Sequence, residues 1–169
     1  EFKKKIKIQN LNKYHIFKNE LEKWCQLFYL GSQRNSQNLE KKKFKNFKKK
    51  EKILQKIFNC AKKASLLIQE NKKKNITQFA KLLDESWKNK KKIHPLVSTT
   101  FVDKKYNIAI RSGSLGGKII GAGNSGFLLV LTPPSKQKKV TKLIKLKEIK
   151  IKFENFGSEI FFLKNKNGL

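Results

Sequence analysis

The feature that most constrains the fold of this chain is a run of glycines near its middle. Residues 112–131 spell SGSLGGKIIGAGNSGFLLVL, and six of the nine glycines in the sequence fall within fourteen residues of this segment. Glycine readily adopts a positive φ, and without a Cβ it lets another backbone or a ligand approach closely. The segment therefore predicts either a tight packing turn or a loop whose backbone amides surround an anion such as phosphate.

Two common phosphate-binding patterns do not fit this segment. A Walker A loop ends in Gly-Lys-Ser/Thr, which is absent here. A dinucleotide-binding fingerprint follows a strand and opens a helix, whereas GAGNSG precedes the apolar run Phe127–Leu131, which predicts a short buried strand. The residues alone leave the packing turn and the anion loop as open alternatives.

The rest of the chain predicts a mixture of strands and helices. Strands are expected over residues 3–10 and 21–31, and a terminal hairpin over 149–165. Apolar residues recur at threes and fours over 37–70 and 75–95, which predicts two amphipathic helices. Two further helices are expected over 99–115 and 135–148, the latter beginning at a serine cap. This order of elements predicts an α+β layered domain.

The net charge of +29 raises the question of a nucleic-acid partner. Only two of the 41 basic residues are arginines, Arg34 and Arg111, and the lysines are spread along the whole chain. Arginine supplies the bidentate contacts by which proteins recognise bases. We therefore expect no specific nucleic-acid partner, although unspecific attraction to phosphate follows from the charge.

Membrane and metal functions are not expected either. The mean hydropathy is −0.62 and the longest apolar run is only Phe127–Leu131, so no membrane span is predicted. The two cysteines, Cys25 and Cys60, stand alone in apolar surroundings and predict buried, reduced thiols. With two isolated histidines besides, the chain offers too few ligands for a zinc site.

Four segments of the sequence resemble the GHMP sugar-kinase superfamily. The stretch GSLGGKIIGAGNSGFLLVLTPP is similar to the third conserved motif of that superfamily, which is close to GGKxxGAGGGGFxL. The stretches LFYLGSQRNSQNL, LLDESWKNKKKI and FENFGSEIFFL are similar, in the same order, to segments of its heptose 7-phosphate kinase branch. Together the matches extend over about residues 20 to 163.

The resemblance implies the C-terminal domain of such a kinase: a four-stranded antiparallel sheet, ferredoxin-like in plan, covered by helices. Residues 16–169 would form this domain, and residues 1–15 would be a remnant of the link to an N-terminal domain. In the family, that N-terminal domain carries the ATP-binding loop and the catalytic acid and lysine. Neither feature, nor any methionine, is found in the 169 residues. We therefore assign no catalytic residue and expect this chain alone to be inactive.

The activity implied by the resemblance is ATP-dependent phosphorylation of a sugar phosphate in the cytoplasm. Within the branch, the acceptor would be the anomeric hydroxyl of a heptose 7-phosphate. ATP and Mg²⁺ would be held mainly by the N-terminal domain, which would also be the partner of this chain. The alternatives are another carbohydrate kinase, such as a fucokinase-like enzyme, or a non-catalytic basic module that binds nucleic acid.

The resemblance places a phosphate-proximal loop at Gly121, Ala122, Gly123, Asn124, Ser125 and Gly126, with Lys118 nearby. Lys118 would either face the phosphate as a point charge or lie in solvent. Asn124 and Ser125 replace two glycines of the family motif. Asparagine tolerates left-handed backbone, so Asn124 can preserve the loop, whereas Ser125 either adds a hydroxyl donor or narrows the site.

Gly31 and Arg34 are the candidate substrate-binding residues. Arg34 matches an arginine of the branch and implies a bidentate contact to the substrate phosphate; alternatively, it is a surface residue that pairs with Glu40. Leu30 stands where the branch has threonine, which removes one possible contact to the sugar. Ser86 and Trp87 lie on a predicted helix, and there packing is the favoured interpretation over substrate contact.

Overall fold

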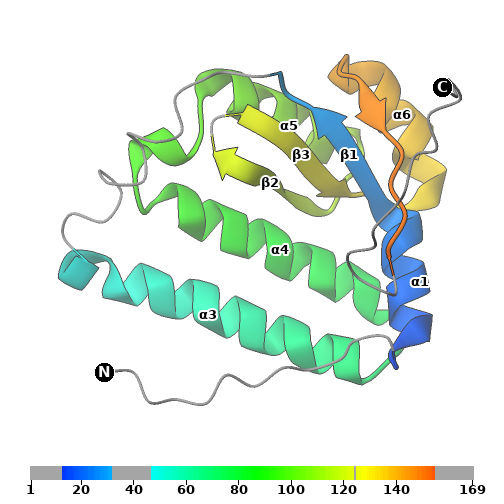
Figure 1. The fold of residues 1–169 in the computed structure, drawn as a ribbon, viewed down its shortest axis with the longest axis horizontal. Helices are drawn as coiled ribbons and strands as arrows, with labels where there is room; N and C mark the ends of the chain where they lie inside the picture. Colours follow the sequence, from blue (N-terminus) through cyan, green and yellow to red (C-terminus); the bar gives the residue numbers. More distant parts are fainter. Residues whose placement is uncertain (1–12, 32–46, 124, 155–169) are drawn as a thin grey trace, which may run out of the picture.

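The computed structural model describes residues 13–31, 47–123 and 125–154, which form an α+β domain (Figure 1). Within these residues, the helices are α1 (His15–Trp24), α3 (Phe47–Gln69), α4 (Asn75–Lys91), the 3-10 helix η1 (Pro95–Val97), α5 (Thr100–Ser112) and α6 (Pro134–Ile144). The strands are β1 (Cys25–Tyr29), β2 (Gly116–Gly123), β3 (Ser125–Leu131) and β4 (Glu148–Ile149).

The four strands form one antiparallel sheet in the order β2-β3-β1-β4. With helices after β1 and after β3, the chain follows the β-α-β-β-α-β plan of ferredoxin-like folds. The predicted fold class, an α+β domain with a four-stranded antiparallel sheet covered by helices, is confirmed. No helix in the described residues is long and apolar enough to cross a membrane.

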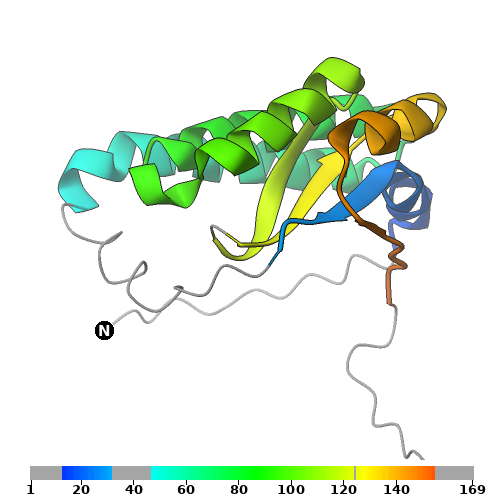
Figure 2. The same cartoon turned by 90° about the horizontal axis from the view of Figure 1, so that it is seen from above.

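The two faces of the sheet are covered unequally. On one face, the buried row Phe28, Leu128 and Ile119 packs into a core with residues of α5 and α6. Figure 2 shows α5 and α6 together on one side of the sheet. Adjacent residues of a strand point to opposite faces, so Cys25, Leu27 and Tyr29 belong to the other face. Only one end of that face is covered, by α1 and α4, which pack with Leu131 in a second core.

Helix α4 runs beside the edge strand β2, and α3 lies outside α4 (Figure 1). Gly116 makes this arrangement possible, because a Cβ at this position would overlap the backbone carbonyl oxygen of Ala80 in α4. A Cβ at Gly117 would collide with β3 instead, at the carbonyl oxygen of Leu129 and the side chain of Val130. Close packing therefore accounts for two glycines of the run.

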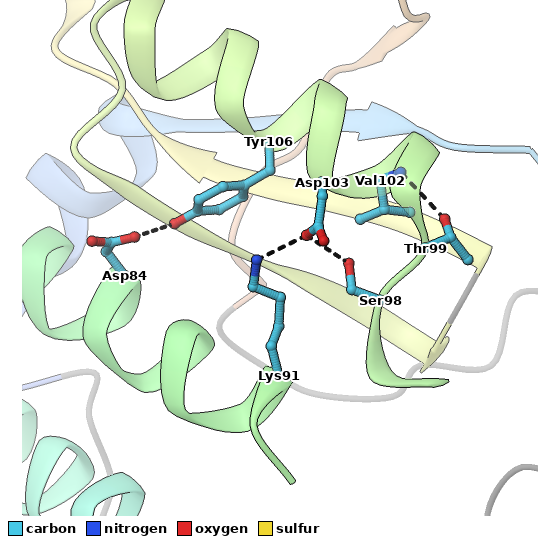
Figure 3. A network of polar contacts seen from close by, with 7 residues as sticks. All are labelled: Asp84, Lys91, Ser98, Thr99, Val102, Asp103 and Tyr106. Atoms are coloured by element: carbon cyan, nitrogen blue, oxygen red, sulfur yellow. Dashed lines mark hydrogen bonds and ion pairs between the residues drawn. The ribbon is translucent and has the colours of Figure 1, made fainter. Parts of the chain in front are cut away.

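A polar network joins α4, Ser98 after η1, and α5 (Figure 3). The hydroxyl of Tyr106 donates a hydrogen bond to Asp84 Oδ1 at 2.6 Å, and Lys88 pairs with the other oxygen of that carboxylate. Asp103 accepts hydrogen bonds from Lys91 and Ser98, both at 2.9 Å. These contacts fix α5 against α4 and, through them, against β2.

Two expectations about secondary structure are wrong. The glycine run was expected as a loop, but residues 116–123 form strand β2. Residues 21–24 were expected in a strand, but they complete helix α1, which buries Phe17 and Trp24. Phe17, Leu21 and Trp24 are spaced by four and three residues, which is the spacing of a helix face. The aromatic residues of the segment favoured a strand, and this helical spacing was overlooked.

The ends of the predicted elements also differ from the structure. Helix α6 begins at Pro134 after an N-cap at Pro133, without a side-chain hydrogen bond, so the predicted serine cap is wrong. Proline suits the first turn because its missing N–H would have no helical partner there. The predicted helices α4 and α5 are confirmed within a few residues. The expected strand over 3–10 and the second strand of the terminal hairpin lie outside the described residues.

Both cysteines are free thiols, as predicted. Cys60 is buried between α3 and α4, whereas Cys25 is only partly buried at the start of β1.

Candidate functional site

The glycine run continues from β2 into β3 as a hairpin with an irregular register near its tip. Ile120 pairs with Phe127 and Gly123 pairs with Ser125, so Gly121 and Ala122 together lie opposite Gly126. Two residues opposing one is the pattern of a β-bulge, which is frequent beside active sites because it redirects the backbone. Asn124 lies outside the described residues.

The bulge requires glycine on both strands. Gly121 has a φ of +102° and Gly126 a φ of +105°, a region that residues with a side chain rarely adopt. A Cβ on Gly126 would also lie 2.8 Å from the carbonyl oxygen of Ile120. These two positions are glycines because of backbone conformation, unlike Gly116, which is needed for contact with a helix.

The end of β1 brings a third glycine to the bulge. The amide of Leu30 donates to the carbonyl oxygen of Gly126 at 2.9 Å, and the amide of Gly126 is 3.4 Å from the carbonyl oxygen of Gly31. Gly31 also has a positive φ, of +90°. We call Gly31, Gly126 and Gly121 the glycine strip, because they lie side by side across the end of β1, β3 and β2. The structure thus brings together two segments that the sequence analysis treated as separate candidate sites.

An aromatic pair lies next to the glycine strip. Tyr29 and Phe127 are register partners, and their ring centroids are 5.5 Å apart. The Tyr29 side chain is 39% exposed although it belongs to a strand in the middle of the sheet. Aromatic faces commonly pack on sugar rings or bases, yet the sequence analysis did not select these residues. The available signal was that Phe127 directly follows Gly126 and that Tyr29 stands two residues before Gly31.

Lys118 occupies a different place from the strip. Its side chain lines a groove between α3 and α4, together with the apolar side chains of those helices. Within the described part of the chain its ammonium makes no hydrogen bond or ion pair. The backbone of Ala122, Gly123 and Ser125 lies in the hairpin strands. Arg34 lies outside the described residues, so its contact to a substrate phosphate stays a prediction.

The described residues provide binding surface rather than acid–base machinery. Over residues 13–31, 47–123 and 125–154, no group of three or more His, Cys, Asp or Glu side chains is placed to hold a metal ion. Burial, followed by the hydrogen bond to the Asp84 carboxylate, raises the pKa of the Tyr106 hydroxyl, which therefore stays neutral in the helix network. The chemistry that the strip offers is that of backbone amides and carbonyls in a conformation without side chains.

The known proteins to which this chain is similar are kinases. No protein-family model matches the chain. Over 156 residues the chain is 25% identical to the D-glycero-alpha-D-manno-heptose 7-phosphate kinase of Campylobacter jejuni, a match that covers 92% of this chain and 46% of that kinase. The chain therefore spans about half the length of the curated relative that it matches.

Solved structures of mevalonate kinases share the fold. The Leishmania major enzyme in complex with R-mevalonate aligns with a TM-score of 0.61 and 15% identity over 72% of this chain and 37% of the enzyme. A second mevalonate kinase aligns with a TM-score of 0.57 and 26% identity, over 86% of this chain and 43% of that protein. These matches confirm the resemblance to GHMP-superfamily kinases that the sequence motifs indicated.

Proposed function

We propose that this chain is the substrate-side, C-terminal domain of a cytoplasmic ATP-dependent kinase of the GHMP superfamily. The acceptor that we propose is the anomeric hydroxyl of a heptose 7-phosphate. The heptose 7-phosphate kinase relative supports this acceptor class, since it matches almost the whole of this chain.

The observation that carries the proposal is the glycine strip at the hairpin of β2 and β3. Phosphoryl transfer depends mainly on positioning and on stabilising negative charge, and backbone groups can do both without moving. A strip of three glycines with positive φ lets phosphate oxygens approach the backbone where side chains would exclude them. The exposed ring of Tyr29 would then lie beside the sugar.

Binding of ATP and magnesium would require a second domain. ATP supplies the transferred phosphoryl group, and the magnesium ion that accompanies it needs oxygen ligands. The described residues offer no cluster of acidic groups for such an ion, so we derive no step through it. We assign nucleotide binding, the metal and the acid–base residues to an N-terminal domain of about the length that the relative has beyond this match.

The identity of the acceptor is open to a direct test. The experiment joins this chain to the ATP-binding half of a GHMP kinase and measures phosphate transfer from ATP to heptose 7-phosphate, fucose and mevalonate. We expect transfer to heptose 7-phosphate and none by the 169-residue chain alone. Preference for fucose or mevalonate would retain the kinase and change its substrate. Absence of transfer to any sugar, combined with sequence-specific DNA or RNA binding, would favour the basic binding module.

Arg34 provides a sharper test of the phosphate on the acceptor. In the joined enzyme, Arg34→Ala should raise the KM for heptose 7-phosphate by one to two powers of ten, on the order of 1.5–3 kcal/mol for a charged hydrogen bond. The KM for ATP should change little. Arg111→Ala, which removes the other arginine from the exposed face of α5, is the matched control. Equal losses for both substrates would show that Arg34 has a structural role.

A further inference from the structure

A groove lies between α3 and α4, away from the glycine strip. Its volume is about 300 Å³, and its walls are largely apolar. Helix α3 contributes Ile57, Cys60 and Ala64, and helix α4 contributes Phe79, Leu82 and Leu83. This volume is at the lower end of the roughly 300–1,000 Å³ that small-molecule sites occupy.

Two polar side chains complete the lining of this groove, Ser86 from α4 and Lys118 from β2. Gly116 lies against the backbone of α4 at Ala80 and Asp84. Lys118 follows Gly116 by two residues in β2, so it belongs to the same face of the strand as the glycine that meets α4. Lys118 and Ser86 thus line the same groove.

Lys118 is a half-buried residue, and within the described part of the chain its ammonium has no acidic or hydrogen-bonding partner. The same holds for the Ser86 hydroxyl. A partly buried cation without a partner loses hydration without compensation, so an anion that reaches it is bound favourably. No acidic side chain is among the described residues that line the groove, although the Glu85 carboxylate accepts a hydrogen bond from the Cys60 thiol in its wall. The part of the groove that favours an anion is therefore the part at Lys118.

We propose that the groove between α3 and α4 binds a single-chain amphipathic carboxylate of about ten carbon atoms. The carboxylate would accept hydrogen bonds from the Lys118 ammonium and the Ser86 hydroxyl, and its chain would lie against the apolar side chains of the two helices. A single lysine and a single hydroxyl match the two oxygens of a carboxylate. This proposal does not depend on the kinase activity, since the groove is formed by this chain alone.

The test uses decanoate as the probe and the 169-residue chain, titrated by calorimetry at 0.15 M ionic strength, roughly the physiological value. We expect saturable binding of one decanoate per chain. Butyrate, which has the charge without the long chain, should bind at least about a hundredfold more weakly. Decanol, which has the chain without the charge, should bind at least about tenfold more weakly than decanoate.

Matched variants separate the groove from the general positive charge of the protein. Lys118→Gln should weaken decanoate binding about tenfold, whereas Lys139→Gln makes the same charge change on the exposed face of α6 and should have no effect. Ala64→Leu should abolish binding by filling the groove, with circular dichroism as the check on folding. Should that variant unfold, the two lysine variants decide the question.

The proposal is overturned by any of three results. These are binding of decanoate without saturation or at many sites, equal affinities of the Lys118→Gln and Lys139→Gln proteins, or decanol that binds as tightly as decanoate. Each of them would show that decanoate is attracted by net charge or by apolar surface in general. Kinase assays are not needed for this decision, so its outcome is separate from that of the proposed function.

Discussion

The two ends of the three long strands belong to one sheet but serve different purposes. At one end the row Gly116, Leu131 and Cys25 lies under α1 and α4, and Leu131 is completely buried. At the other end the row Ile120, Phe127 and Tyr29 points to the same face, and no described helix covers it. We call these the packed end and the open end.

Glycine is concentrated at both ends for different physical reasons. At the packed end Gly116 is required because the backbone of α4 occupies the space of a side chain. At the open end Gly121 and Gly126 are required because of their positive φ at a bulge. A glycine cluster therefore indicates close approach or unusual backbone, and only the neighbouring elements decide which.

The packed end should be the more sensitive to added volume. Gly116→Ala places a methyl group on the backbone of Ala80, which no side-chain rotation can relieve. We expect the free energy of unfolding to fall by about 3 kcal/mol or more, as measured by urea denaturation. A loss below about 1 kcal/mol would mean that α4 shifts easily away from β2, and the distinction between the ends would weaken.

At the open end, Gly126→Ala should separate folding from function. The positive φ and the contact with Ile120 predict a loss of about 2–3 kcal/mol in stability, with the circular dichroism of the folded chain retained. In the joined kinase we expect kcat to fall around a hundredfold, because a small displacement of the strip misplaces the phosphoryl group. Normal turnover by the folded variant would argue against a phosphate role for the strip.

Gly31→Ala makes the same chemical change as Gly116→Ala without a steric conflict. No atom lies within 4 Å of a Cβ placed on Gly31, so only the cost of the positive φ remains. That cost is about 1–2 kcal/mol in the free energy of unfolding. If Gly31→Ala were as destabilising as Gly116→Ala, backbone conformation rather than helix contact would dominate at both ends.

The alkylation rate of the Cys25 thiol measures how well the packed end is covered, and it requires no substitution at that end. Burial and, to a smaller extent, the Glu22 carboxylate raise the pKa of Cys25 to about 12. Because the thiolate is the reactive form, alkylation at pH 8.5 should be about a thousandfold slower in the folded protein than in urea. The folded rate should keep rising between pH 9 and pH 11, roughly the range in which an unfolded thiol has already titrated.

This measurement is made in a Cys60→Ser background, so that a single thiol reacts. Gly116→Ala should accelerate the labelling, whereas Gly31→Ala should not. Equal rates in the folded and urea-treated protein would show that α1 does not cover the start of β1.

Helical periodicity and glycine content allowed a large part of the fold to be predicted. Apolar residues at threes and fours predicted the helices that the structure shows as α3 and α4, and the run Phe127–Leu131 located β3. The helix α1 was missed because a short segment with Trp24, Phe28 and Tyr29 satisfies strand propensity as well as helix period. In such short segments the packing of Phe17 and Trp24 into the core decides the outcome.

What the sequence by itself determined is the composition of the candidate site and its resemblance to a family of kinases. Motif order along the chain sufficed for that, because it requires no knowledge of distances. Only the tertiary structure decided that Gly31 lies beside Gly126 and that Lys118 faces a groove between two helices. Strand pairing joins residues about ninety-five positions apart, and the contact of β2 with α4 selects which glycines are structural. Both depend on long-range packing, which local residue patterns do not encode.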